Sequence, residues 1–376
     1  MKITASVGNR APTHGEGASG GAFPLRATTA AAATDLLRDA QAVGKVALLG
    51  PIAWRTPPRH YGPWEQVAGL LADGLAQRGV DVTLFATLDS QTTATLDGVS
   101  PRGYEEDASL DGRVWEGLHV AHALSRSSEF DLMHNHLDWL PLAFSKHCRT
   151  RLLTTIHGFS DRKILPAYQA ADSAYVSISD ADRAPELAYC ATVYHGIDLS
   201  LFTFSASGGE DLVILGRIHP DKGTAEAIDI AKRVRRRLKI AGPIQDAAYF
   251  EEHVAPLIDN DRVCYLGSVG PDQRSDLLAS AAALLHPIAF AEPFGLSVVE
   301  SMAAGTPVIA YNRGSMPEII DEGVTGFLVS DAESAAAAVD SAIKLDRSKV
   351  RRVAERRFSA DRMIDDYLAL YATILR

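Results

Sequence analysis

Two carboxylates, Glu292 and Glu300, flank a glycine in the C-terminal half of the sequence. Gly295 follows the apolar run 281–286, which is typical of a buried strand, and precedes a segment with helical periodicity. The first N–H groups of a helix have no partner within it, and the helix dipole favours negative charge at this end. A strand, a glycine turn and a new helix therefore predict an anion site, with phosphate as the expected ligand.

Two cations follow another apolar run, 212–216. Arg217 and Lys222 lie where a strand is expected to end and a helix to begin, so both can converge on a phosphate held near Gly295. Each has a plainer explanation as a surface charge, or as the partner of Asp221 in a salt bridge at the helix start. Together with the two carboxylates, the cations form a more informative set than any of these residues alone.

The loop 51–65 offers a second group of candidate residues. Gly62 and Pro63 suit the N-cap and first position of a helix, and Glu65 at the third position complements the helix dipole. Long irregular loops on rigid α/β scaffolds usually carry function, so we expect this loop to line a substrate pocket. Its aromatic side chains either stack on a sugar ring or pack the loop: Trp54, Tyr61 and Trp64.

Two short patterns suggest other chemistry. His134-Asn135-His136 is similar to a nuclease motif, but the net charge of -10 argues against nucleic acid, which favours cleft lining or loop structure. Asp180 and Asp182 have the D-x-D spacing of metal-dependent sugar transferases. We favour a structural role, in which Asp180 caps a helix that begins there.

The elements that must position these residues alternate between β-type runs and helical patterns, as in a parallel sheet covered on both faces. A linker-like stretch at 199–210 divides the strands into two sets of six, which predicts two Rossmann-like halves with a ligand cleft between them. The expected strands are 45–49, 81–85, 131–134, 151–156, 174–178, 192–194, 212–216, 238–241, 262–266, 283–287, 307–310 and 326–329.

Composition limits the remaining choices. A length of 376 residues with 47% apolar content predicts two globular domains, and the three distant cysteines suggest neither disulfides nor a zinc site. No apolar run is long enough to cross a bilayer, so we expect a cytoplasmic protein. The basic runs 232–237 and 351–357 are explained as charged helix ends, with peripheral docking at the inner leaflet of the membrane as the alternative.

Several motifs, taken in series, closely resemble glycosyltransferase family 4, a family of retaining enzymes with the GT-B fold. The resemblance covers about 45–376 and departs at Gly62-Pro63, where many members carry paired glycines. The matching motifs are Thr155-Ile156-His157-Gly158, Tyr194-His195-Gly196-Ile197-Asp198, Gly216-Arg217, Lys222-Gly223, Glu292-Pro293-Phe294-Gly295-Leu296 with Glu300, Gly305-Thr306-Pro307-Val308, Pro317-Glu318 and Gly326-Phe327-Leu328-Val329.

This resemblance implies a GT-B α/β fold with two Rossmann-like domains that face a central cleft. Residues 45–200 would form the acceptor domain and 201–358 the nucleotide-sugar donor domain, and a last helix at 359–376 would cross back to the first. We expect 1–44 to be a disordered extension, unless the natural start lies near Val43.

The resemblance also implies roles for single residues. Glu292 would bind hydroxyls of the donor sugar, Glu300 the ribose hydroxyls, and His157 would face the donor sugar and the acceptor. Arg217 and Lys222 would neutralise the diphosphate leaving group. The catalytic set would be His157, Glu292, Arg217 and Lys222, and the donor-binding set Gly62, Arg217, Lys222, Glu292, Phe294, Gly295, Leu296 and Glu300.

The implied reaction is transfer of a hexose, with retention, from a nucleotide diphosphate sugar to a carbohydrate, glycan or lipid acceptor. UDP is the expected nucleotide, and no metal or cofactor is expected beyond the donor itself. The alternative is a GT-B nucleotide-sugar epimerase or a phosphorylase. The sugar, the acceptor, the linkage and the oligomeric state stay open.

Overall fold

The computed structural model describes residues 40, 42–158 and 162–376 of the chain. The predicted extension 1–44 therefore lies outside the described residues, apart from its last few. Of these, Ala40 and Val43 are buried in the core of the N-terminal half.

The N-terminal half is built on a seven-stranded parallel sheet in the order β3-β2-β1-β4-β5-β6-β7. Valine, leucine and isoleucine dominate its central strands, as expected of strands covered on both faces. The strands are β1 (Lys45–Leu49), β2 (Asp81–Phe85), β3 (Thr95–Asp97), β4 (Leu132–Asn135), β5 (Arg151–Ile156), β6 (Ala174–Ser177) and β7 (Tyr189–Thr192).

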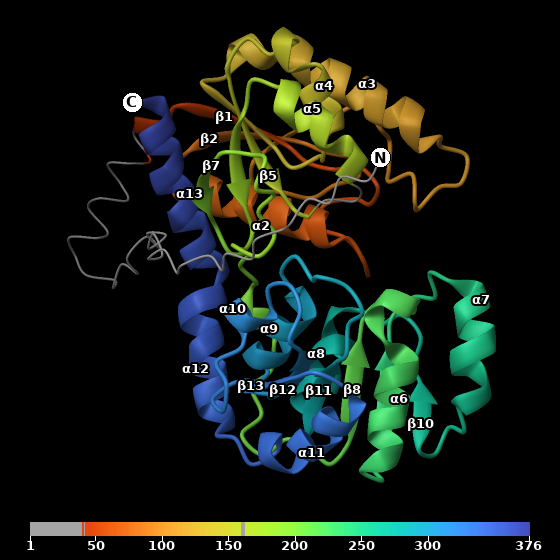
Figure 1. Ribbon diagram of the computed structural model, residues 1–376. Helices are drawn as coiled ribbons and strands as arrows, with labels where there is room; N and C mark the ends of the chain where they lie inside the picture. The colour runs from red at the N-terminus through yellow and green to blue at the C-terminus, as the bar shows by residue number, and fades with distance from the viewer. Residues whose placement is uncertain (1–39, 41, 159–161) are drawn as a thin grey trace, which may run out of the picture.

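The C-terminal half carries a six-stranded parallel sheet in the order β10-β9-β8-β11-β12-β13. Figure 1 shows it below the first sheet. Its strands are β8 (Leu212–Leu215), β9 (Leu238–Ala241), β10 (Val263–Tyr265), β11 (Ala283–His286), β12 (Val308–Tyr311) and β13 (Gly326–Val329).

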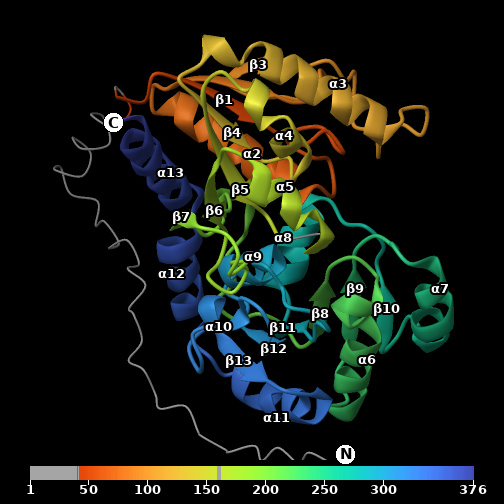
Figure 2. The same ribbon diagram turned by 45° about the horizontal axis from the view of Figure 1, so that its top comes forward.

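Helices cover both sheets (Figures 1 and 2). They are α2 (Pro63–Gln77), α3 (Gly112–Ser125), α4 (Leu140–Ala143), α5 (Leu165–Ala170), α6 (Thr224–Arg233), α7 (Ala247–Tyr249), α8 (Pro271–Ala279), α9 (Leu296–Ala303), α10 (Met316–Ile319), α11 (Ala332–Ala342), α12 (Arg347–Phe358) and α13 (Ala360–Leu375). No helix among the described residues is long and apolar enough to cross a membrane.

The predicted arrangement of two parallel sheets is confirmed, and the structure differs in two details. β3 was not predicted, because three half-exposed residues leave too short a pattern to detect. The strand expected at 192–194 lies at Tyr189–Thr192 instead. The division of the chain into domains at 200 stays a prediction.

The last two helices join the halves. α12 packs against α9 in the C-terminal half, and α13 packs against α2 in the N-terminal half (Figures 1 and 2). Gly74 of α2 permits this contact, because a Cβ there would lie 2.1 Å from Cδ1 of Ile364. Met363, Tyr367 and Tyr371 are fully buried, so the predicted return of the last helix to the N-terminal half is confirmed.

Candidate functional site

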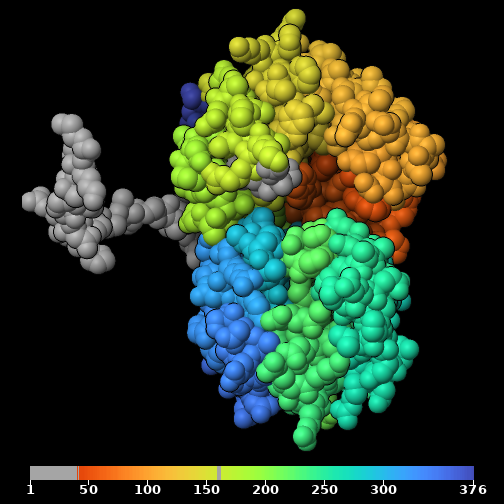
Figure 3. Space-filling view, turned by 45° about the vertical axis from the view of Figure 1, so that its right-hand side comes forward, coloured from red at the N-terminus to blue at the C-terminus, as the bar shows by residue number. Residues whose placement is uncertain are grey.

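A cavity of about 330 Å³ lies between the two halves, at the carboxyl ends of both sheets. The space-filling view shows the molecule hollowed along this boundary (Figure 3). One wall is formed by the loop before α2 and the residues that follow β5 and β7, and the other by the residues that follow β8 and β11. All nine candidate site residues line the cavity: Gly62, His157, Arg217, Lys222, Glu292, Phe294, Gly295, Leu296 and Glu300.

Gly295 forms the predicted turn before a helix. It is the N-cap of α9 and has φ 90°, a left-handed conformation that favours glycine. A Cβ at this position would also lie 2.7 Å from Cε of Met316. Leu296 and Ser297, the first residues of α9, line the cavity, so the positive end of the helix faces it.

Glu292 is held by a cation. Its Oε2 accepts a hydrogen bond from Nζ of Lys222 at 2.6 Å and lies 3.6 Å from Nε2 of His286. Burial alone would raise the pKa of Glu292, but His286 and Lys222 outweigh burial and hold this pKa at about 2. The ammonium of Lys222 also lies 4.7 Å from the centre of the Phe290 ring. Glu292 is therefore an ionised acceptor at any pH near neutrality.

Glu300 is held by a second cation that the sequence did not reveal. Nη1 of Arg274 donates to Oε1 of Glu300 at 2.8 Å, and Nη2 donates to the backbone oxygen of His60 at 3.2 Å. Burial raises the pKa of Glu300, and Arg274 only partly offsets this. A single arginine in the first turns of α8 gives no sequence signal. Arg274 thus connects the C-terminal wall to the loop before α2 in the N-terminal half.

Arg217 lines the same cavity, but the structure does not bring it into contact with Lys222 or Glu292. Its Nη1 donates to Oε1 of Gln245. Its Nε is buried and has no hydrogen-bond partner within the described chain. The guanidinium also faces the Tyr61 hydroxyl, whose pKa is raised chiefly by burial and lowered in part by Arg217. An unsatisfied buried N–H is costly, which makes Arg217 a donor ready for an anion.

His157 lies on the N-terminal wall with its ring stacked on Trp64, the ring centres being 5.2 Å apart. Its Nε2 lies 3.0 Å from Nδ1 of His136 and its Nδ1 lies 3.2 Å from Nε2 of His195. Burial lowers the pKa of His157, as do the neighbouring histidines. The ring is therefore neutral. Trp64 packs on His157 and also lines the cavity, and its stacking on a sugar ring stays a prediction.

The loop before α2 has the predicted capping residues. Gly62 is the N-cap with φ 150°, and a Cβ there would lie 2.8 Å from Cβ of Pro58. Glu65 is buried, and its Oε1 accepts a hydrogen bond from the N–H of Trp54 at 3.1 Å. Burial raises the pKa of Glu65 to about 7. The prediction that this loop lines a pocket is confirmed for residues 60–64.

The prediction that Asp180 caps a helix is wrong. Turns follow β6, and Oδ1 of Asp180 accepts a hydrogen bond from Oγ1 of Thr192 at 2.6 Å. Glu318 of the C-terminal half accepts from the N–H groups of Asp180 and Ala181 at 2.8 and 2.6 Å, which removes these donors from any helix. Among the described residues no His, Cys, Asp or Glu side chains form a group of three suited to a metal ion.

His134 and His136 are fully buried and do not line the cavity. Of the two expectations for this motif, cleft lining is wrong for both side chains, and loop structure holds for His136, which follows β4. They lie behind the wall, because β4 directs them toward the core between β5 and α13.

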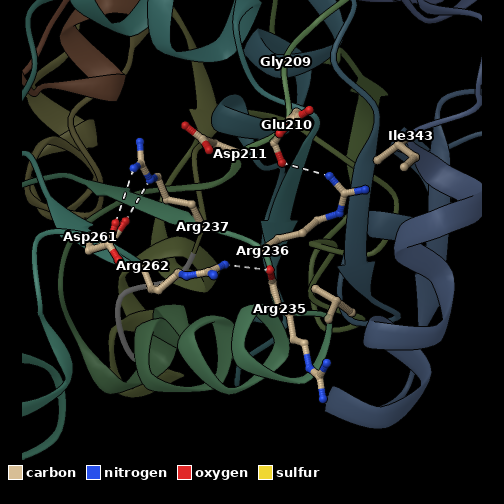
Figure 4. A pocket seen from close by; sticks show the side chains of 10 residues that line it. Gly209, Glu210, Asp211, Arg235, Arg236, Arg237, Asp261, Arg262 and Ile343 are labelled. Atoms are coloured by element: carbon tan, nitrogen blue, oxygen red, sulfur yellow. Dashed lines mark hydrogen bonds and ion pairs between the residues drawn. The ribbon is translucent and has the colours of Figure 1, made fainter.

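A second cavity, of about 820 Å³, lies at the amino ends of strands in the C-terminal sheet, opposite the cleft. Figure 4 shows the residues that line it. Its walls are the residues before β8, β9 and β10, so it is remote from the carboxyl ends that form the cleft. The arginines there bind backbone oxygens: Arg236 binds Glu210, Arg237 binds Asp261 and Arg262 binds Arg235. Of the basic run 232–237, only Lys232 and Arg233 lie at a helix end, because α6 ends at Arg233.

Residues 203–357, which include Lys222, Glu292 and Glu300, match the sequence model of the family described as Glycosyl transferases group 1. The match places the paired carboxylates and the Gly295 turn in the matched region, in the order that the resemblance implied. The match and the two-sheet fold support a GT-B glycosyltransferase of the family 4 type.

Curated relatives of this glycosyltransferase include the glycogen synthase of Mycobacterium tuberculosis, 26% identical over 82% of this chain and 90% of the relative. The D-inositol 3-phosphate glycosyltransferase of Mycobacterium marinum is 26% identical over 72% of this chain and 71% of its own length.

Solved structures share its fold. AviGT4, a glycosyltransferase involved in avilamycin A biosynthesis, is 26% identical with a TM-score of 0.67 and covers 88% of this chain and 98% of its own. Alr3699/HepE of Anabaena, in complex with UDP and glucose, is 19% identical with a TM-score of 0.69 over 88% and 99% of the two chains. The GT-B fold expected for the glycosyltransferase is confirmed.

Proposed function

We propose that the protein transfers a hexose from a UDP-sugar to a carbohydrate, glycan or lipid acceptor, with retention of configuration and without a metal ion. One observation carries the proposal. In the C-terminal wall, two cations are bound to two carboxylates, and a third cation, Arg217, keeps a buried Nε without a partner within the described chain. A diphosphate would satisfy this donor.

The leaving group is the first point of support. Departure of a nucleoside diphosphate builds negative charge, which fixed cations and helix N–H groups stabilise without reorganisation. Lys222, Arg217 and the start of α9 at Gly295 surround the same cavity. Because these charges come from the chain itself, the proposal needs no metal to stabilise the leaving group.

The carboxylates supply the second point of support. Glu292 is ionised and only one of its oxygens is bound to Lys222, so the other can accept hydrogen bonds from sugar hydroxyls. Glu300 lies further along α9 beside Arg274, where we assign it to the ribose. We expect no covalent intermediate on Glu292, because its ion pair with Lys222 reduces its nucleophilicity.

The choice of UDP rests on its frequency in the family, and HepE, a protein of the same fold, was crystallised with UDP-glucose. The acceptor would enter beside His157 and Trp64, where the N-terminal wall is neutral and aromatic. Such a surface suits a sugar ring.

A screen of UDP- and GDP-sugars with mono- and oligosaccharide and lipid acceptors tests the proposal through released nucleoside diphosphate. We expect release that persists in a chelator, and a product with the anomeric configuration of the donor by NMR. Cleavage that requires inorganic phosphate and releases no nucleotide would indicate a phosphorylase, and interconversion of the sugar without transfer would indicate an epimerase. Either result overturns the proposal.

A further inference from the structure

Four buried histidines form a continuous row behind the N-terminal wall. In this histidine array, His134 contacts His136, His136 contacts His157 and His157 contacts His195, with nitrogen–nitrogen distances of 3.2, 3.0 and 3.2 Å. The four come from three places in the sheet: the end of β4, the end of β5 and the segment after β7. Sheet topology, rather than sequence proximity, thus brings them together.

The two ends of the array differ. At the inner end, Nδ1 of His134 lies 2.5 Å from the hydroxyl of Tyr371 on α13, and Nε2 lies 2.8 Å from Oγ1 of Thr155. At the outer end, Nδ1 of His195 has no hydrogen-bond partner within the described chain. His157 and His195 line the cavity, whereas His134 and His136 do not. The junction between His157 and His195 is therefore the one that a ligand in the cavity can reach.

All four rings are neutral. Burial lowers the pKa of His134, and it lowers the pKa values of His136 and His195 to about 3 each, while burial and the adjacent rings lower the pKa of His157. A neutral imidazole carries one N–H, so each of the three junctions must use the N–H of one of its two rings. The protons can consequently point along the array in only two ways.

The two directions differ in what they leave unpaired. If every proton sits on Nε2, then His195 donates to His157, His157 to His136 and His136 to His134. The single lone pair on Nδ1 of His134 is then shared by the Nε2–H of His136 and the hydroxyl of Tyr371, and a lone pair on His195 is left over. If every proton sits on Nδ1, the hydroxyl of Tyr371 and the Nδ1–H of His195 both lack acceptors within the described chain. The first direction leaves fewer buried donors unpaired and is therefore favoured, because an unpaired buried donor is costly.

We propose that His134 and His136 are positioning residues: they fix His157 as its Nε2–H tautomer. The Nδ1 lone pair of His157 then points to the cleft side, where a hydroxyl of the bound sugar can replace His195 as its donor. The hydroxyl of Tyr371 contacts the inner end of the array, which α13 therefore borders. The contact between His157 and a sugar hydroxyl rests on the proposed sugar transfer, whereas the tautomer of His157 does not.

The tautomer is measured without substrate by 15N NMR of histidine-labelled protein. In the native chain we expect the pyrrole-type signal of His157 to belong to Nε2 and the pyridine-type signal to Nδ1. His136→Leu removes the acceptor of the Nε2–H, so both tautomers should be populated. His136→Gln is the matched control, because its amide oxygen accepts from His157 while its NH₂ donates to His134, and it should restore the native signals.

Activity gives a second readout. His136→Leu should lower kcat/KM for the donor by about tenfold, as expected for one lost hydrogen bond of this kind, and His136→Gln should recover most of it. Tyr371→Phe keeps all four histidines and removes only the competing donor at Nδ1 of His134, so it should keep the native tautomer of His157.

An Nδ1–H tautomer of His157 in the native chain, or native signals in His136→Leu, would overturn the proposal. The first outcome is measured on the native chain, so it decides the question even where His136→Leu does not fold. If no donor is turned over by the native chain, the proposed function fails, but the NMR result still decides the tautomer.

Discussion

The two walls of the cleft carry their buried polar groups in different charge states. In the C-terminal wall, Glu292 and Glu300 are each matched with a cation, Lys222 and Arg274. In the N-terminal wall, the rings around His157 are neutral and hydrogen-bonded to one another. Both arrangements satisfy buried groups, but only the first leaves charges in the cavity.

The difference indicates where charge must change during the reaction. Buried ion pairs are costly to desolvate and are weak grounds for stability, so a wall with two of them is better explained by binding an anion. A neutral wall costs less and suits a ligand whose charge does not change, such as a sugar acceptor. The charged wall would therefore act on the leaving group and the neutral wall on the hydroxyls.

The largest effect is expected from Lys222→Met, which removes the cation from the charged wall. It leaves Glu292 buried without its partner and withdraws charge from the leaving group, so kcat should fall by about 10³-fold. Released nucleoside diphosphate is the measurement. Lys239→Met is the control, because Lys239 pairs with Asp211 at 2.9 Å on the same sheet, away from the cleft, and should leave kcat unchanged. A loss below tenfold in Lys222→Met would mean that the walls do not differ as argued.

Behind the neutral wall, the buried side chain of Glu65 in α2 predicts a pH effect on stability. Burial raises its pKa from 4.5 to about 7, so the stability that comes from its neutral form is complete below pH 4.5 and is lost as the pH rises through 7. Glu65→Gln keeps an acceptor for Trp54 and should be more stable than the native chain at pH 8.5, by up to about 3 kcal/mol, with little difference at pH 4.5.

Urea unfolding at the two pH values measures this effect. Glu251→Gln, an exposed position in the other half, is the control and should not change the pH dependence. A native-like pH dependence in Glu65→Gln would show that folding does not raise the pKa of Glu65.

The charged wall could be predicted from the sequence to the extent that its contacts are local. Gly295 and Glu300 belong to one turn and one helix, and their spacing already indicated an anion site. Arg274 was not predicted, because its contacts with Glu300 and with the backbone of His60 depend on how the two halves meet. The same holds for Asp180, whose predicted cap failed because Glu318, distant in sequence, binds the N–H groups there.

The neutral wall was less predictable. His157 was identified by resemblance, but the histidine array joins strand ends with α13 at the far end of the chain. The contact of His134 with Tyr371 spans 237 positions, which no local pattern encodes. The fold was easier, since most strands repeat a strong apolar pattern, whereas the short β3 was not predicted and β7 was placed three residues too late.

A smaller effect separates roles within the charged wall. Glu300→Ala removes an acceptor assigned to the ribose, which is bound equally before and during transfer, so the donor Kd should rise about 10–100-fold with little change in kcat. Arg217→Ala should instead lower kcat by about 10–100-fold, since its Nε meets a charge that grows in the transition state. Calorimetry with donor and steady-state kinetics measure the two. Equal losses in Kd and kcat for both variants would show that the residues act as one unit.

The smallest effect is expected at the arginine cavity on the opposite edge of the sheet (Figure 4). Arg236→Ala and Arg262→Ala each remove a hydrogen bond to a backbone oxygen, worth about 1 kcal/mol in unfolding free energy, and should leave kcat within twofold. Flotation with anionic and neutral vesicles tests the remaining alternative for this basic run. We expect no binding to either, because acidic side chains at Glu210 and Asp261 lie among the arginines. Binding to anionic vesicles that both variants lose would make this edge a docking face, and would place the membrane away from the cleft.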